Sequence, residues 1–567
     1  MASPHEKAGP LADTNNDSAT AGKPVAPQEP SVSEPDADKV QQSRPGYDPE
    51  AEKNFQPKTL KFWLIILPIF VSVFLVALDR TILATAVPRI TDEFKSLGDI
   101  GWYGSAYMLA TSACQLLFGR IYRFYSIRWT LLVTIVVFEI GSAVCGAAPS
   151  SEVFIAGRAI AGVGSAGIWT GSMMSIIPMV PLHKRPVFQG LFGMVFGISS
   201  VSGPLIGGAF TERATWRWCF YMNLPIGAVA FALLYLFMHP ASPKVERATA
   251  MQQITRLDPL GTFFFVPSVA CLLLALQWGG STYAWSNWRI ILLFVMFGVT
   301  AVAFAVVQVR MPETATLPVR ILRRRTVLSA TFFMLFLAAS MILVIYYLPL
   351  WFQATKNVNP VDSGIYTIPL VLSLVVASIA NGIVTQKIGY YAPSMILSPC
   401  VTAIGYGLLT TFTPDTGSPR WIGYQFITGF GIGLGMQSTG LAMQATLPRE
   451  DISTGVAITF FAQQLGGAVF VTVGQTILST LLVKQLRDVP GLDAARIVRT
   501  GATELHKAVP AQFVGTVINA YNFAVTRIFY CALALALAQL VAASFIEWRS
   551  IKKPKGVAAA ADKAADA

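Results

Sequence analysis

The sequence predicts an all-α polytopic membrane protein, in which two six-helix bundles related by a parallel repeat flank two extra central helices. Hydrophobic residues make up 54% of the chain and charged residues only 13%, whereas about a quarter of the residues of a soluble protein are charged. Apolar windows of about 20 residues, enough to cross a hydrocarbon core of about 30 Å, recur from Phe62 to Phe545. Short motifs of the first half also reappear in the second.

Fourteen membrane spans are predicted from these windows. They cover residues 62–82, 103–121, 129–148, 153–176, 187–209, 219–238, 259–277, 288–309, 327–350, 364–385, 392–412, 421–442, 455–482 and 527–546. The predicted domains are a disordered cytoplasmic tail (1–57), an amino-terminal bundle (58–240), two inserted helices with their loops (241–325), a carboxy-terminal bundle (326–548) with an external loop at about 483–526, and a cytoplasmic tail (549–567).

The net charge of +12 could indicate a nucleic-acid partner. The basic residues are instead scattered over alternate loops, such as Arg120, Arg123 and Arg128 after the second span. This bias follows the positive-inside rule, which predicts that both termini are cytoplasmic. We therefore expect these three arginines only to set the topology, and we expect no nucleic-acid partner.

An internal echo relates the two halves of the chain. Residues 158–164 of the fourth span, an arginine followed by two spaced glycines, are matched by residues 425–431 of the twelfth, where glutamine replaces the arginine. Such an echo is expected when two six-helix bundles are related by a parallel repeat. Spans seven and eight are then an insertion between the bundles.

Asp79 lies inside the first apolar window, where an ionised carboxylate costs about 2.5 to 3.5 kcal/mol on insertion scales. The first span runs outward and Asp79 lies several residues below its outer end. The fourth span runs inward and Arg158 lies several residues below its outer start. The two charges should share a layer, either as a proton-coupling pair or as a permanent structural ion pair.

Glu139, near the middle of the third span, is a second candidate for proton coupling. The alternative is an acid that burial keeps neutral and that bonds to serine or threonine. The six cysteines and four histidines show no metal-type spacing, so we expect neither a metal site nor a cofactor.

Several motifs resemble the major facilitator superfamily, most closely its fungal fourteen-span drug:proton antiporters, over about residues 60 to 550. They are Leu78-Asp79-Arg80-Thr81-Ile82 with Pro88, Arg158 with Gly162 and Gly164, Gly190 with Gly203-Pro204-Leu205-Ile206-Gly207-Gly208, residues 216–227, and Tyr346-Tyr347-Leu348-Pro349 with Phe352-Gln353. The resemblance implies the major facilitator fold and links Arg158 to proton transfer.

The run from Gly203 to Gly208 resembles the antiporter motif of that family. Its glycines let helices approach closely, and Pro204 removes a backbone hydrogen bond and permits a bend. We therefore expect hinge and helix-packing roles for Gly190, Gly203, Pro204, Gly207, Gly208, Gly162 and Gly164. Packing without any hinge is the alternative. The sequence departs from the family pattern at Ser199, where glycine is expected, and at Arg123, where an acid that latches the inner gate is expected.

A substrate cavity is expected between the bundles. Its predicted polar and aromatic lining is Gln115, Tyr346, Gln437, Gln463 and Gln464. Apolar walls with few hydrogen-bonding groups suit amphipathic ligands of varied structure.

The predicted function is export of a hydrophobic or amphipathic organic compound, such as a toxin, drug or secondary metabolite, in exchange for protons. The alternatives are proton-coupled import of a ligand such as a siderophore-iron chelate, and a transporter-like sensor. An enzyme is not expected, because the chain has no clustered nucleophile, base or metal site. The expected partners are a small-molecule substrate, protons and the lipid bilayer, and the expected form is a monomer in the plasma or vacuolar membrane.

Overall fold

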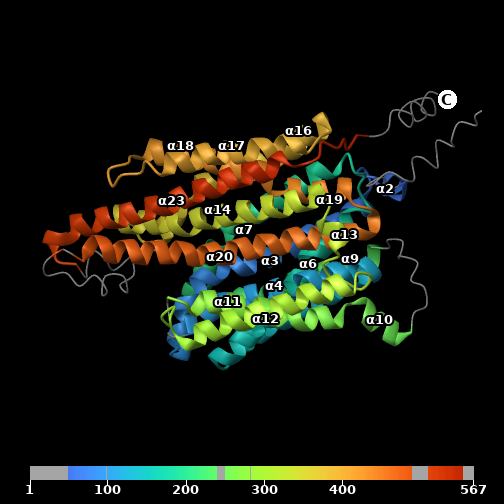
Figure 1. The fold of residues 1–567 in the computed structure, drawn as a ribbon, viewed down its shortest axis with the longest axis horizontal. Helices are drawn as coiled ribbons and strands as arrows, with labels where there is room; N and C mark the ends of the chain where they lie inside the picture. Colours follow the sequence, from blue (N-terminus) through green and yellow to red (C-terminus); the bar gives the residue numbers. More distant parts are fainter. Residues whose placement is uncertain are drawn as a thin grey trace, which may run out of the picture. The chain divides into compact units, whose positions relative to one another are not determined.

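The computed structural model describes residues 49–96, 99–238, 249–280, 282–487, 489 and 509–552. These residues form helices joined by short connections, with two isolated β-bridges and no strand (Figure 1). The helices are α2 Pro49–Asn54, α3 Leu60–Phe94, α4 Ile100–Phe124, α5 Ile127–Ala147, α6 Ser151–Ile176, α7 Arg185–Arg213, α8 Trp218–Tyr221, α9 Asn223–Phe237, α10 Ala250–Arg256, α11 Pro259–Trp278, α12 Trp288–Arg310, α13 Val319–Leu322, α14 Arg325–Lys356, α15 Pro360–Tyr366, α16 Ile368–Ile388, α17 Ala392–Leu409, α18 Ser418–Met436, α19 Ser438–Thr446, α20 Ile452–Leu486 and α23 Val514–Ser544.

Twelve helices of the described part are long and apolar enough to cross a membrane. The other two predicted windows, 103–121 and 421–442, coincide with α4 and α18, which have similar lengths but carry more polar residues or glycine. The all-helical membrane fold is therefore confirmed, whereas the count of fourteen spans stays a prediction.

Two predicted segments differ in detail from the structure. The tail 1–57 is expected to be disordered, but α2 forms in it, and Glu50 and Glu52 lie within ion-pair distance of Arg449 and His183. Residues 1–48 of that tail lie outside the described residues. The external loop 483–526 is shortened at both ends, because α20 runs to Leu486 and α23 begins at Val514. The middle of this loop and the tail beyond Lys552 also lie outside.

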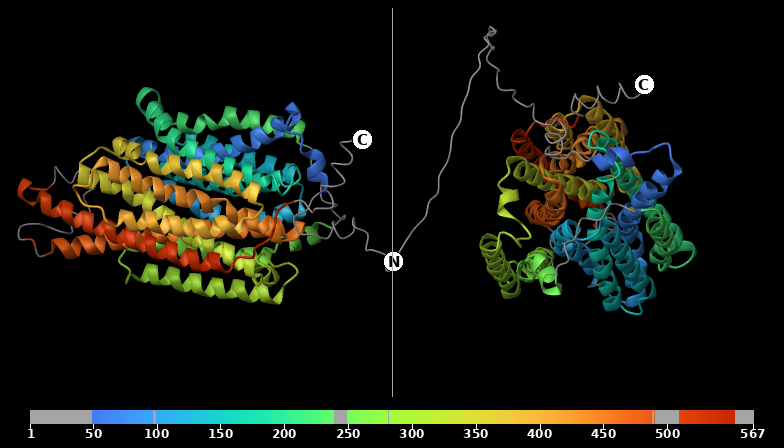
Figure 2. Two further views of the ribbon diagram at one scale, coloured as in Figure 1. Left: turned by 90° about the horizontal axis from the view of Figure 1, so that it is seen from above. Right: turned by 90° about the vertical axis from the view of Figure 1, so that its right-hand side faces the viewer.

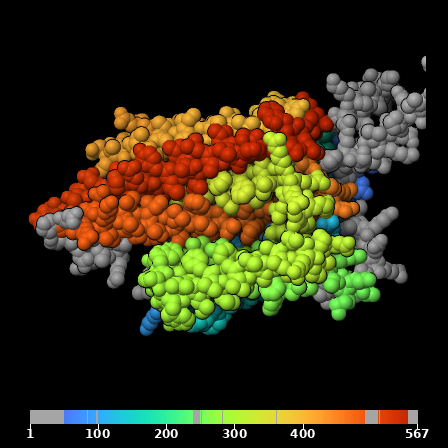
Figure 3. All heavy atoms as spheres, in the orientation of Figure 1, coloured from blue at the N-terminus to red at the C-terminus, as the bar shows by residue number. Residues whose placement is uncertain are grey.

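The spanning helices form two groups. Helices α3 to α9 pack on one another in an amino-terminal group, and α14 to α23 form a carboxy-terminal group (Figure 2). The groups meet along two seams, α4 against α20 and α7 against α16. The inserted pair, α11 and α12, packs beside the first seam through α11, while α12 exposes most of its apolar side chains (Figure 3). An apolar helix face of this kind suits contact with lipid.

The same backbone contacts recur in both groups. In the amino-terminal group, Nε of Arg158 donates to the carbonyl of Tyr103, and a Cβ on Gly162 would lie 2.4 Å from the carbonyl of Tyr107. In the carboxy-terminal group, Nε2 of Gln425 donates to the carbonyl of Tyr366.

The glycines complete this correspondence. A Cβ on Gly429 would lie 2.1 Å from the carbonyl oxygen of Leu370, and a Cβ on Gly164 or on Gly431 would lie 2.5 Å from a backbone nitrogen. Only glycine allows two helices to approach so closely. The parallel repeat expected from the sequence is therefore visible as repeated contacts, and Gly162 and Gly164 have a packing role in it.

Asp258 anchors the inserted pair at one end. Its buried carboxylate accepts hydrogen bonds from the backbone N–H of Gly261 at 2.8 Å and of Thr316 at 2.9 Å, and from Nε2 of Gln308 at 2.7 Å. Arg120 of α4 donates to the carbonyl of the neighbouring Ala315 at 3.0 Å. The inserted pair is therefore tied to the amino-terminal group at this end.

Replacing Asp258 should destabilise the protein. Asp258→Ala leaves several buried donors without an acceptor, each costing about 1 to 3 kcal/mol, so we expect a loss of about 3 kcal/mol or more in the free energy of unfolding. Thermal unfolding of the purified protein in detergent measures it. Asp415→Ala, at an exposed aspartate, is the control. Equal melting temperatures for both variants would contradict the anchoring role.

Candidate functional site: a buried ion pair beside the contact between the helix groups

A buried ion pair joins α3 to α6. Nη1 of Arg158 donates to Oδ2 of Asp79 at 2.6 Å, and both side chains are only 1% exposed. The structure therefore brings together the two residues that helix direction and depth had placed in one layer. Each charge stabilises the other in surroundings where either alone would be costly.

The surroundings of the pair are aromatic. The guanidinium of Arg158 lies 4.5 Å from the ring centroid of Tyr107 and 6.0 Å from that of Phe220. Its Nε donates to the carbonyl of Tyr103 at 2.9 Å. Oδ1 of Asp79 is buried and has no hydrogen-bond partner among the described residues. This oxygen is the atom on which a proton can bind without first displacing a hydrogen bond.

Glu139 of α5 lies against α9. Both of its carboxyl oxygens are buried and have no hydrogen-bond partner among the described residues. A Cβ on Gly227 of α9 would lie 1.8 Å from Oε1, so the carboxyl fills the space that this glycine leaves. The serine or threonine bond considered for Glu139 is not formed. Its proposed share in proton coupling stays a prediction.

Helix α7 presses its glycines against α3. A Cβ on Gly203 would lie 2.2 Å from Oγ1 of Thr81, and one on Gly207 would lie 2.2 Å from Oγ1 of Thr85. Oγ1 of Thr81 also donates to the carbonyl of Ser199 at 3.0 Å, just before Pro204. Within 4 Å of a Cβ on Gly208 there is nothing, so Gly208, unlike Gly203 and Gly207, takes no part in this contact.

Gly190 belongs to the second seam instead. A Cβ at this position would lie 2.7 Å from the carbonyl of Ser378 on α16, and one on Gly382 of α16 would lie 2.5 Å from the carbonyl of Pro186. At the first seam, a Cβ on Gly119 of α4 would lie 2.5 Å from the Cβ of Ala457 on α20. All these contacts lie near the helix ends that the sequence assigns to the cytoplasm, which we call the inner end.

A charged cluster closes the inner end. Asp451, just before α20, accepts hydrogen bonds from Arg320 at 2.8 and 3.0 Å and pairs with Arg123 of α4 at 3.1 Å. The expectation that Arg123 only sets the topology is therefore wrong. This ion pair joins a base on α4 to an acid on the other group, the reverse of the family pattern, in which the acid stands where Arg123 is. Sequence reasoning missed Asp451.

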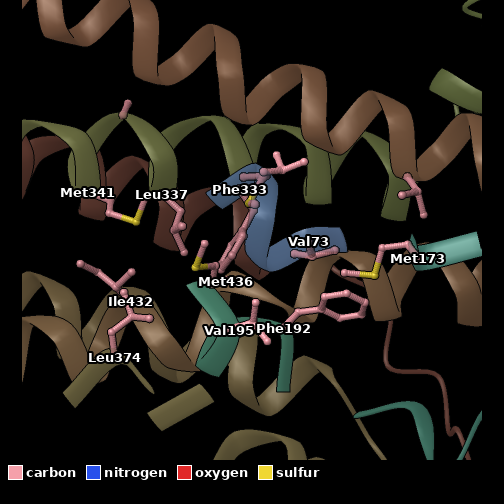
Figure 4. Close-up of a cluster of buried hydrophobic side chains, with 14 of the residues drawn as sticks. Val73, Met173, Phe192, Val195, Phe333, Leu337, Met341, Leu374, Ile432 and Met436 are labelled. Carbon is pink, nitrogen blue, oxygen red and sulfur yellow. The ribbon is translucent and has the colours of Figure 1, made fainter. Parts of the chain in front are cut away.

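An apolar cluster fills the space between the groups (Figure 4). The amino-terminal group contributes Val73, Met173, Phe192 and Val195, and the carboxy-terminal group contributes Phe333, Leu337, Met341, Leu374, Ile432 and Met436. These side chains include methionines, whose flexibility lets a surface adapt to ligands of different shape. We call this set the central cluster.

The predicted cavity residues separate in the structure. Nε2 of Gln115 donates to Thr170 at 2.7 Å inside the amino-terminal group, and Tyr346 is 54% exposed on the face of α14 opposite Met341. Their place in a substrate cavity stays a prediction. Gln437 lies at the break between α18 and α19.

Two glutamines of α20 complete the predicted lining. Oε1 of Gln464 accepts a hydrogen bond from Arg80 of the other group at 3.3 Å, and Gln463 precedes it. Arg80 was not predicted as a site residue, although it directly follows Asp79.

The sequence profile of the Major Facilitator Superfamily matches residues 69–471, most of the spanning part. The chain belongs to the Major Facilitator Superfamily. The fold agrees, because this facilitator resembles the proton:xylose symporter XylE with a TM-score of 0.56, at 16% identity over 87% of this chain and 97% of that one. The human organic anion transporter MFSD10 gives a TM-score of 0.55 at 13% identity, covering 85% of this chain and 100% of that one.

Fungal efflux pumps are much closer to this facilitator in sequence. The MFS-type efflux pump MFS1 of Arthroderma benhamiae is 50% identical over 88% of this chain and 94% of its own length. The efflux pump aflT of Aspergillus parasiticus is 49% identical over 89% of this chain and 99% of its own length. The rubrofusarin-specific efflux pump aurT of Gibberella zeae is 48% identical, over 88% and 91%. These relatives confirm the resemblance to fungal efflux facilitators, and the facilitator is a multi-pass membrane protein.

Gly207 and Gly208 should respond differently to alanine. Gly207→Ala places a methyl group against Thr85 and Ile82, whereas Gly208→Ala meets open space. We expect Gly207→Ala to cost about 1 to 3 kcal/mol of stability, as overpacking does, and Gly208→Ala to leave the melting temperature unchanged. Thermal unfolding in detergent compares them. A similar loss in both variants would contradict the assigned contact.

Removing the acid of the inner-end cluster should loosen the first seam. The reporter is a cysteine introduced at the seam as Ala457→Cys, labelled in inside-out vesicles with a membrane-impermeant maleimide. Adding Asp451→Asn should make this labelling about fivefold faster or more, because a change of about 1 kcal/mol in the free energy of opening the seam has this effect. The matched control is Glu450→Gln, because Glu450 is exposed. Unchanged labelling by Asp451→Asn would show that the cluster does not hold the seam.

Proposed function

We propose that this facilitator exports a hydrophobic or amphipathic organic compound in exchange for protons by alternating access. The observation that carries the proposal is the buried ion pair of Asp79 and Arg158. Both residues lie on helices of the amino-terminal group, which meets the carboxy-terminal group along two seams. The relatives named efflux pumps support the outward direction.

The proton step is a change of partner at Asp79. While ionised, the carboxylate pairs with Arg158 and holds α3 against α6. A proton on the carboxylate removes the negative charge, so that Arg158 keeps the Tyr103 carbonyl and the rings of Tyr107 and Phe220 but loses its counter-ion. The attraction between α3 and α6 weakens, and these helices can shift relative to each other. Loss of the proton restores the pair.

The movement of α3 reaches the rest of the site through α7. Gly203 and Gly207 couple α7 tightly to α3, and Gly190 of the same helix contacts α16 of the carboxy-terminal group. A displacement of α3 is therefore transmitted to the second seam. The inner end is closed in this structure by both seams and by Asp451, so opening it requires these contacts to separate.

Cargo would bind where the groups face each other, at the central cluster. Its apolar side chains come from both groups, and an apolar surface of this kind suits apolar or aromatic skeletons (Figure 4). A gradient of one pH unit supplies about 1.4 kcal/mol, and 100 mV supplies about 2.3 kcal/mol per charge. Together they sustain a cargo gradient of several hundredfold per proton. We place the pump in the plasma membrane as a monomer with both termini in the cytoplasm.

The test is proton-coupled transport in sealed inside-out vesicles with an acidic interior. Rubrofusarin is the first probe, because a relative at 48% identity is named a rubrofusarin-specific pump. We expect uptake by the wild type, and less than about a tenth of it with Asp79→Asn, since proton transfer groups contribute at least a hundredfold, roughly, in other proteins.

The matched control is Asp92→Asn, at an exposed aspartate near the end of the same helix. This variant should transport like the wild type, and surface expression is compared for all three proteins. Full transport by Asp79→Asn would end the proton role of Asp79. Uptake into whole cells driven by an inward proton gradient would reverse the proposed direction and favour import.

A further inference from the structure

Three successive residues of α3 contact three different neighbours. Asp79 pairs with Arg158 of α6, Arg80 reaches Gln464 of α20, and Thr81 donates to α7 at Ser199. Only the middle residue crosses from one helix group to the other. Arg80 therefore lies next to the proton-binding residue in sequence but belongs to the contact between the groups.

The Arg80 cation is not neutralised by a carboxylate. Its Nη2 donates to Oε1 of Gln464 at 3.3 Å, and its guanidinium lies 5.7 Å from the ring centroid of Tyr107. No ion pair joins Arg80 to any acid in the described part of the chain. The nearest acid in sequence, Asp79, already pairs with Arg158. A guanidinium has five N–H donors, so most of them remain for another acceptor.

A second polar atom beside Arg80 also lacks an acceptor. Nε2 of Gln464 is buried and has no hydrogen-bond partner among the described residues. Its orientation is fixed chemically, because the amide oxygen must face the Arg80 donor and the amide nitrogen then faces elsewhere. Leaving a buried N–H unsatisfied costs about 1 to 3 kcal/mol. A cargo that places oxygen atoms at this contact would supply acceptors to Arg80 and to Gln464.

The apolar part of the site lies along the same helix faces. Val73 of the central cluster precedes Arg80 by two helical turns on one face of α3, which is about 10 Å at 1.5 Å per residue. On α20, Phe460 lies one turn before Gln464 and packs against Trp169 of the other group with ring centroids 5.6 Å apart. A fused aromatic skeleton of two or three rings matches this length.

We propose that Arg80 and Gln464 form a subsite for an ionised oxygen, a phenolate or carboxylate, on an aromatic cargo whose skeleton lies against the central cluster. This inference rests on the proposed export function and gives its cargo a chemical class, aromatic organic acids and acidic phenols. Arg80 is then a specificity-determining residue, and charge-assisted hydrogen bonds to it select anions over cations of the same shape.

The test compares two dyes that share one tricyclic skeleton, anionic fluorescein and cationic rhodamine 123. Their Kd values for the purified full-length protein in detergent at pH 8 are measured by fluorescence polarisation, without any proton gradient. We expect Arg80→Gln to weaken fluorescein binding about tenfold or more and rhodamine 123 binding little or not at all. Arg310→Gln, at an exposed arginine at the end of α12, is the matched control.

A second variant separates recognition from a merely structural tie between the groups. Gln464→Glu keeps and strengthens the contact with Arg80 but neutralises the cation, so fluorescein binding should fall as it does in Arg80→Gln, at a melting temperature no lower than wild type. Retained fluorescein binding in Gln464→Glu, an unchanged ratio of the two Kd values in Arg80→Gln, or no fluorescein binding by the wild type would each overturn the subsite.

The same dye distinguishes failure of the subsite from failure of the proposed function. Fluorescein uptake is measured in the acid-interior vesicles with the wild type. Arg80-dependent binding without any gradient-driven uptake would leave the subsite standing and refute proton-coupled export. Gradient-driven uptake that Arg80→Gln does not alter would support proton-coupled export and refute the subsite.

Discussion

A charge inside a bundle of apolar helices needs a partner at its own depth, and this requirement organises the amino-terminal group. Asp79 and Arg158 meet at 2.6 Å only because α3 and α6 hold a fixed register. Tyr103 and Tyr107 of α4 complete the surroundings of Arg158, and α4 can come close enough because Gly162 has no side chain. The ion pair thus depends on glycine packing, and the packing brings three helices to one polar point.

The depth of residues could be predicted from the sequence, whereas their direction around a helix axis could not. Hydropathy and the alternation of span direction were enough to place Asp79 beside Arg158. Tyr346 shows the limit, because it has a suitable depth but lies on the exposed face of α14. Asp451 shows another limit: its partner Arg123 lies on the other half of the chain, and no local pattern relates them.

The two groups share a scaffold but divide the chemistry. The amino-terminal group holds the ion pair of Asp79 and Arg158, and beside it Arg80 reaches the other group. The carboxy-terminal group faces it with amides, methionines and aromatic rings. Different side chains form the ion pair and the apolar surface that both groups contribute, so energy input and cargo selection can change separately.

The correspondence between Arg158 and Gln425 has a consequence for how such a chain can evolve. Each side chain donates to a tyrosine carbonyl at 2.9 Å at equivalent places in the two groups. The backbone contact therefore survives whichever of the two residues is present, and only the charge differs. If the halves descend from a duplicated ancestor, one copy could gain or lose its buried charge by a single exchange between arginine and glutamine, with the fold unchanged. Duplication followed by divergence then has a low structural barrier at this position.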